Sequence, residues 1–150
     1  MATKPPQELA QTLKSIETGS LRLNQLATEI SQRIVAFEDW LNRLPGKTAT
    51  TFWYDTSDDG AISFGLALNR DGKRWALWHV TCVEPTDEED WSLLKEASVD
   101  VKLKVVSYFP AFLEAIVKAQ AELAKELEKA HSEFDLFANA IGLTPMKEGK

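Results

Sequence analysis

The chain has little cysteine and no long apolar run. Its single cysteine, Cys82, excludes an intrachain disulfide, so the sequence gives no sign of a secreted, disulfide-held scaffold. No stretch approaches the roughly 20 apolar residues that a membrane-spanning helix needs, and the N-terminal residues lack the apolar core of a signal peptide. We therefore expect a cytoplasmic protein with no membrane partner.

The sequence also has fewer basic than acidic residues, and it lacks two common cofactor and metal motifs. The 17 Lys and Arg residues against 23 Asp and Glu residues give a net charge of −6, and an acidic surface repels phosphate backbones. The sequence contains neither a glycine-rich phosphate loop nor the paired cysteines of a zinc site. We expect no cofactor and no metal, identify no catalytic residue, and expect nucleic acid to be disfavoured as a partner.

What the sequence does contain is enough apolar residues for a folded domain. Hydrophobic residues make up 44% of the 150 residues and charged residues 27%, which is ordinary for a globular protein. A chain of this length fits one domain, residues 1–150. The order of its patterns predicts an α+β fold in which two long antiparallel helices flank a three-stranded antiparallel meander.

Heptad-spaced apolar residues predict a long helix over residues 7–44. One series recurs every seven residues from Leu9 and a second from Leu13, so the steps alternate between four and three. Pro45-Gly46 ends the pattern. The series continues through Gly19, which favours one helix over two.

The same pattern predicts a second long helix over residues 110–143. Its two series begin at Leu113 and Ile116, Gly142 indicates a C-terminal cap, and residues 144–150 are expected to form a loose tail. Apolar residues also flank both heptad seams, so each stripe is wider than one partner helix can cover. We therefore predict a homo-oligomer and favour a dimer. The alternative is that the sheet and loops of the same chain cover the stripes.

Period-two patterns predict the β-meander within residues 48–83. Apolar residues alternate with small ones from Ile62 to Leu68, and Asp71-Gly72 belongs to a hairpin signal. A turn of two or four residues would place Leu66 opposite Trp75. One face of the meander would then be apolar and pack on the helices, and the other would carry small residues.

One large aromatic residue, Trp78, stands on that second face, which makes the face a candidate docking surface. Binding hot spots favour tryptophan, tyrosine and arginine, and histidine adds a group that titrates near neutral pH. The predicted partner-binding residues are Trp78, Trp53, Trp75, His79, Arg70 and Arg74.

Residues 84–109 are expected to form a connection that contains a short element. Residues 98–109 fit both the alternation of a strand and the spacing of a helix. We favour a short helix, because Ser98 is typical of a helix N-cap, and expect a bend at Pro110.

The wide stripes, the aromatic sheet and the lack of a catalytic constellation favour a non-enzymatic, oligomeric scaffold or adaptor that binds a protein or peptide. One alternative is a small enzyme or ligand-binding protein that uses His79 and an acidic loop. Another is an accessory factor that binds single-stranded nucleic acid with Arg70, Lys73 and Arg74 beside Trp75. The order long helix, β region, long helix is similar in outline to prefoldin subunits, and that resemblance implies chaperone-like binding of non-native chains.

Overall fold

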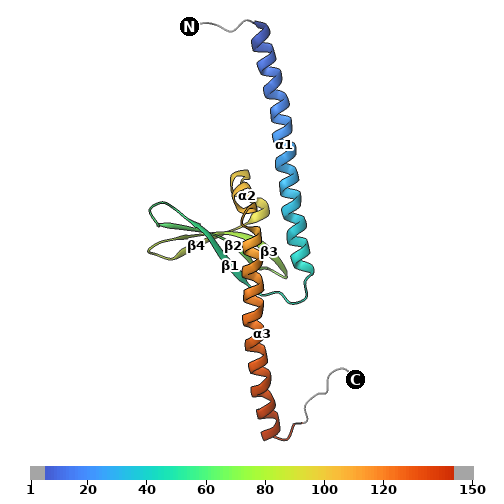
Figure 1. Cartoon of the computed structure of the whole chain (residues 1–150), viewed down its shortest axis with the longest axis vertical. Helices are drawn as coiled ribbons and strands as arrows, with labels where there is room; N and C mark the ends of the chain where they lie inside the picture. The colour runs from blue at the N-terminus through green and yellow to red at the C-terminus, as the bar shows by residue number, and fades with distance from the viewer. Residues whose placement is uncertain (1–5, 144–150) are drawn as a thin grey trace.

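A computed structural model describes residues 6–143, which form three α-helices and one four-stranded antiparallel sheet (Figure 1). The helices are α1 (Pro6–Arg43), α2 (Val99–Val106) and α3 (Phe109–Ala140). The strands are β1 (Thr50–Thr56), β2 (Ile62–Asp71), β3 (Arg74–Val83) and β4 (Glu88–Leu93), in the order β1-β2-β3-β4, and a short 3-10 helix, η1 (Leu94–Glu96), follows β4. The predicted α+β class is confirmed. The predicted tail, residues 144–150, lies outside the described residues.

The prediction of three strands is wrong, because β4 lies within the segment that was expected to be a connection. This strand pairs antiparallel with β3, from Trp78 opposite Leu93 to Val83 opposite Glu88. Strand β4 was not predicted because its first three residues are acidic, and acidic side chains are depleted in strands. As a result β3 is an interior strand where β4 pairs with it, and an edge strand over residues 74–77.

The hairpin between β2 and β3 closes with a tight turn in which Gly72 adopts a positive φ of 64°. Asp71 pairs with Arg74, and Leu66 lies opposite His79, so the predicted pairing of Leu66 with Trp75 is wrong by four residues. A shift by an even number of residues leaves every side chain on its predicted face. The predicted division into a helix-packed apolar face and a face of small residues is therefore confirmed.

Both long helices are continuous, as their patterns predict. The helix α1 passes through Gly19 without a break. At the end of α3, Gly142 has a φ of 78° and the N–H of Leu143 donates to the carbonyl of Ala138 at 2.7 Å. This is the predicted glycine cap, which satisfies carbonyl groups that the helix leaves open.

The favoured short helix is also present, as α2. The hydroxyl of Ser98 accepts the N–H of Val101 at 3.3 Å, which is the contact of an N-cap. Pro110 bends no helix; it lies in the first turn of α3, where the missing N–H has no helical acceptor.

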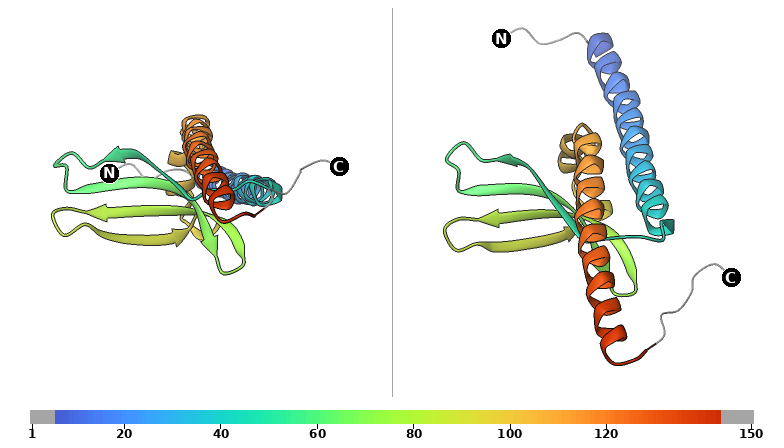
Figure 2. Two further views of the ribbon diagram at one scale, coloured as in Figure 1. Left: turned by 90° about the horizontal axis from the view of Figure 1, so that it is seen from below. Right: turned by 60° about the horizontal axis from the view of Figure 1, so that its bottom comes forward.

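The two long helices do not form the predicted antiparallel pair. Figures 1 and 2 show α1 and α3 running in the same direction and displaced along the long axis of the molecule. The chain returns to the side of α1 through η1 and α2, both of which contact α1, before α3 begins. The two helices meet at Phe37 and Phe109, whose ring centroids lie 5.0 Å apart.

The core lies between one face of the sheet and the overlapping parts of the helices. Within the described residues, α1 contributes to it from Ile34 onward and α3 as far as Ile116. Full burial of each large aliphatic or aromatic side chain contributes about 1.5–3 kcal/mol. The buried members are Ile34, Leu41, Leu66, Leu68, Leu77, Leu94, Val105, Phe112 and Ile116.

Candidate functional site

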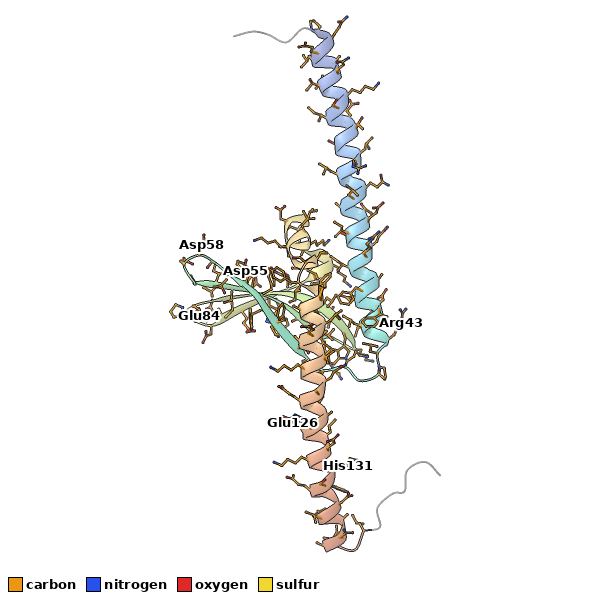
Figure 3. The ribbon with its side chains drawn as sticks, viewed as in Figure 1. Arg43, Asp55, Asp58, Glu84, Glu126 and His131 are labelled. Atoms are coloured by element: carbon orange, nitrogen blue, oxygen red, sulfur yellow. The ribbon has the colours of Figure 1, made fainter. Side chains whose placement is uncertain are left out.

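Two helical arms extend from the body at opposite ends of the molecule (Figure 1). We define the α1 arm as residues 6–26 and the α3 arm as residues 121–140. In Figure 3, Glu126 and His131 mark the α3 arm, whose side chains project with no other element beside them. With a rise of 1.5 Å per residue, each arm is about 30 Å long. The arms are therefore long enough to carry a helix–helix interface of several turns.

The arms expose the residues of the heptad series. Leu23 is 71% exposed and Phe134 is 60% exposed, although leucine and phenylalanine are usually buried. A contiguous exposed apolar stripe marks an interaction site. Among residues 6–143, no helix combines the length and apolarity that crossing a bilayer requires. The other exposed heptad residues of the arms are Leu9, Leu13, Ile16, Leu123, Leu127 and Phe137, and Ile141 follows α3.

Each stripe continues into a groove at the root of its arm. The α1 groove, of about 350 Å³, lies between α1, α2 and the start of α3, and its lining includes Ile30, Leu103 and Val106. The α3 groove, of about 330 Å³, lies between α3 and residues 45–48, and its lining includes Leu127. Arm and groove together form one apolar surface at each end of the body.

The outer face of the sheet, which is the face turned away from the core, carries tryptophans over small residues. Trp53 lies opposite Gly65, and a Cβ added to Gly65 would lie 2.9 Å from the Trp53 ring. The rings of Trp78 and Trp91 meet edge to face with centroids 5.9 Å apart, and Nε1 of Trp78 donates to the carbonyl of Asn69 at 3.2 Å. Trp53 remains 42% exposed. This face is a second candidate surface.

Trp91 is the residue of this face that sequence reasoning missed. It lies in β4, opposite Val80, in a segment that was expected to be a connection. The alternation of Trp91 and Leu93 with Asp90 and Ser92 is the signal that could have found it.

The structure separates the six predicted partner-binding residues. Trp53 and Trp78 lie on the outer face, whereas the pairings of β2 with β3 place Trp75 and His79 on the opposite face, with the core. Trp75 and Trp78 thus lie on opposite faces, as strand alternation predicts, and Trp75 belongs to the residues packed against the core.

The two predicted arginines are engaged by other side chains of the chain. The guanidinium of Arg70 lies 5.7 Å from the ring centroid of Trp75, and Arg74 pairs with Asp39 of α1 at 3.1 Å. The Arg74–Asp39 pair connects the hairpin tip to α1, whereas Arg70 and Trp75 both belong to the hairpin. These contacts also engage two of the three cations, Arg70 and Arg74, on which the nucleic-acid alternative depends.

His79 is a buried, hydrogen-bonded residue. Its Nε2 lies 2.8 Å from the hydroxyl of Tyr54, and its ring stacks on Phe64. Burial, with a smaller effect from the charge of Lys104, lowers the pKa of His79 below its ordinary value of 6.5. Burial, followed by the charge of Asp55, raises the pKa of Tyr54. A neutral Tyr54 hydroxyl that donates a hydrogen bond to a neutral His79 imidazole fits both shifts, and this is the environment of a core residue.

The acidic residues of two turns contact neighbours that are close in the sequence. Asp59 accepts the hydroxyl of Ser57 at 2.7 Å, and this bond is the main cause that lowers the pKa of Asp59. Cys82, Glu84 and Asp87 bring ligand atoms within 4.8 Å of one another. Burial and then the adjacent carboxylates raise the pKa of the Cys82 thiol, and a protonated thiol is a poor metal ligand.

Comparisons of the chain with protein-family models, with curated proteins and with solved structures find no match. The outline similarity to prefoldin subunits therefore has no support beyond the order of the elements. What the chain does has to follow from the two arms and the outer face of its own sheet.

Proposed function

We propose that this protein is the subunit of a homo-oligomer that acts through protein–protein interaction, as a scaffold or adaptor, and not through catalysis. The uncovered apolar stripes of the two arms carry this proposal. They hold eight large apolar heptad residues, followed by Ile141 just after α3, that the rest of residues 6–143 leaves exposed. Removing apolar surface from water yields about 25 cal/mol per Å², so association of the arms is the natural way to stabilise them.

Each of the two candidate surfaces has its own role in this proposal. The arms assemble the subunits, because their heptad spacing is that of helices that pack on one another. The outer face of the sheet, with Trp53, Trp78 and Trp91, binds the partner protein, because tryptophan is enriched among the residues that dominate binding energy.

Light scattering at micromolar concentration tests the assembly. The expected result is a mass that is a multiple of 16.8 kDa, with twice that mass favoured. A monomer would overturn the proposed function. It would leave the open stripes as a surface for non-native chains, which is the chaperone-like alternative.

Affinity capture from the native host tests the role of the outer face. Trp53→Ala is expected to abolish capture of the partner while the oligomeric mass stays unchanged. Trp40→Ala is the matched control, because Trp40 is a similarly exposed tryptophan that lies on α1. If Trp53→Ala captures the same proteins as the wild type, the outer face does not bind the partner.

A further inference from the structure

We propose that two copies form a closed dimer in which the α1 arm of each copy lies antiparallel along the α3 arm of the other. This inference rests on the proposed oligomeric function and specifies which surface meets which. It names a second copy of this chain as the occupant of both stripes and of the grooves at their roots.

The placement of the arms is the first reason. They leave the body at opposite ends, while α1 and α3 run in the same direction (Figures 1 and 2). A two-fold rotation about an axis perpendicular to the long axis exchanges the two ends and reverses the helix direction. One such operation therefore brings the partner's α3 arm beside the α1 arm, antiparallel to it, and the partner's α1 arm beside the α3 arm.

The matching of the stripes is the second reason. The arms, residues 6–26 and 121–140, are nearly equal in length. From Leu9 forward the α1 stripe advances by steps of 4, 3, 4 and 3, and from Ile141 backward the α3 stripe recedes by the same steps. Residue i of one copy then lies opposite residue 150−i of the other. The facing pairs are Leu9 with Ile141, Leu13 with Phe137, Ile16 with Phe134, Ser20 with Ala130, and Leu23 with Leu127.

The grooves are the third reason, because this register carries each arm into the groove at the root of the other. Beyond the arms, Ala27 would face Leu123, and Ile30 would face Gln120. Ile30 lines the α1 groove, whereas Gln120 and Leu123 line the α3 groove. The two grooves would thus meet in one interface that continues the arm contacts into the body.

Closure of the assembly is the fourth reason. Pairing α1 arms with each other at one end and α3 arms at the other would link each copy to two neighbours and build an open chain. The reciprocal pairing covers all four arms with two copies. A standard stable interface uses about 20–30 residues a side, and two arms that each give half of their residues supply about 20.

Site-specific cross-linking tests the arrangement in the full chain with Cys82→Ser as the background. Leu13→Cys and Phe137→Cys are made in separate, differently tagged chains, which are mixed, refolded together and treated with a short thiol-reactive cross-linker. Both positions are exposed, so the core is untouched, and far-UV circular dichroism verifies folding. A cross-linked heterodimer is the expected product, and Leu13→Cys alone should give none, because the two copies of residue 13 lie at opposite ends.

Leu13→Cys mixed with Leu123→Cys is the matched control. Leu123 belongs to the same stripe but would face Ala27, and 14 residues of helix, about 20 Å, separate it from residue 13 of the partner. Cross-linking of Leu13→Cys with itself, or equally with Leu123→Cys, would overturn the arrangement. A dimer by light scattering without the 13–137 cross-link would overturn this inference alone, whereas a monomer would overturn the proposed function as well.

Discussion

The carboxylate of Glu38 occupies the place of a neighbouring strand beside Leu77. Its Oε2 accepts the N–H of Leu77 at 3.0 Å, at the edge of β3 that β4 leaves open, because β4 pairs with β3 only as far as Trp78. Asn42, one helical turn further, accepts the N–H of Trp75 at 3.1 Å in the same way. Two side chains of α1 thus complete the edge of the sheet, and they fix the direction in which the α1 arm leaves the body.

Replacement of Glu38 should therefore destabilise the fold far more than replacement of its exposed neighbour. Glu38 is 2% exposed, and its Oε1 lies 3.6 Å from the ammonium of Lys95. Glu38→Ala therefore removes the carboxylate partner of both this ammonium and the N–H of Leu77. We expect the free energy of unfolding to fall by about 2–3 kcal/mol, the cost of an unsatisfied buried group. Denaturant titration measures it.

Asp39→Ala is the matched control for that experiment. It removes an exposed ion pair with Arg74, and such pairs are worth less than about 1 kcal/mol. Equal losses in the two variants would show that the edge contact of Glu38 has no special role.

Substitution within a stripe should weaken the oligomer, whereas substitution beside it should not. Leu23→Ser removes a heptad residue from an interface that contains it twice, so the dimer should lose about 3 kcal/mol or more. That loss corresponds to an increase in Kd of about a hundredfold or more. Sedimentation over a range of concentrations measures the Kd.

Leu21→Ser provides the comparison, because Leu21 is 73% exposed but belongs to neither heptad series. The same pair of variants exists on the other arm, as Phe134→Ser and its off-series control Leu136→Ser. If the control variants dissociate the oligomer as strongly as the stripe variants, the heptad stripes are not the interface.

Two glycine substitutions should change stability in opposite directions. Gly65→Ala places a methyl group 2.9 Å from the ring of Trp53, and overpacking of this kind costs about 1–3 kcal/mol. Gly19→Ala meets no atom within 4 Å in the middle of α1 and should stabilise the helix by up to about 1 kcal/mol. Thermal unfolding gives the sign, and near-UV circular dichroism should change for Gly65→Ala alone. An unchanged spectrum for that variant would contradict the packing of Trp53 on Gly65.

Acidification should destabilise the protein through His79. The folded state holds the pKa of His79 below the unfolded value of 6.5, so the unfolded chain binds more protons as the pH falls through 6.5. Stability is therefore fully present above that pH and is lost below it, by up to about 1.4 kcal/mol per pH unit, until the folded pKa is reached.

Denaturant titrations between pH 7.5 and 5.5 measure this slope, and His79→Gln should flatten it. Glutamine can still accept a hydrogen bond from Tyr54 but does not titrate in this range. A variant that retains the full wild-type slope would place the proton uptake on another group.

The long helices and their ends could be predicted because local residues decide them. The heptad steps, the cap at Gly142 and the N-cap Ser98 each depend on contacts within a few residues. The outer position of Trp78 followed from strand alternation in the same way. Trp91 was missed because the acidic residues before it have a low strand propensity. Pairing with β3, which is a contact between distant parts of the chain, makes this segment a strand all the same.

By itself, the sequence determined which segments form the long helices and which of their faces are apolar. Only the tertiary structure decided that α1 and α3 run in the same direction and that their arms extend from opposite ends. The reason is that helix direction depends on contacts between residues far apart in the chain, such as Glu38 with Leu77 and Phe37 with Phe109. Periodicity records which side of a helix is apolar, but it carries no information about which element covers that side.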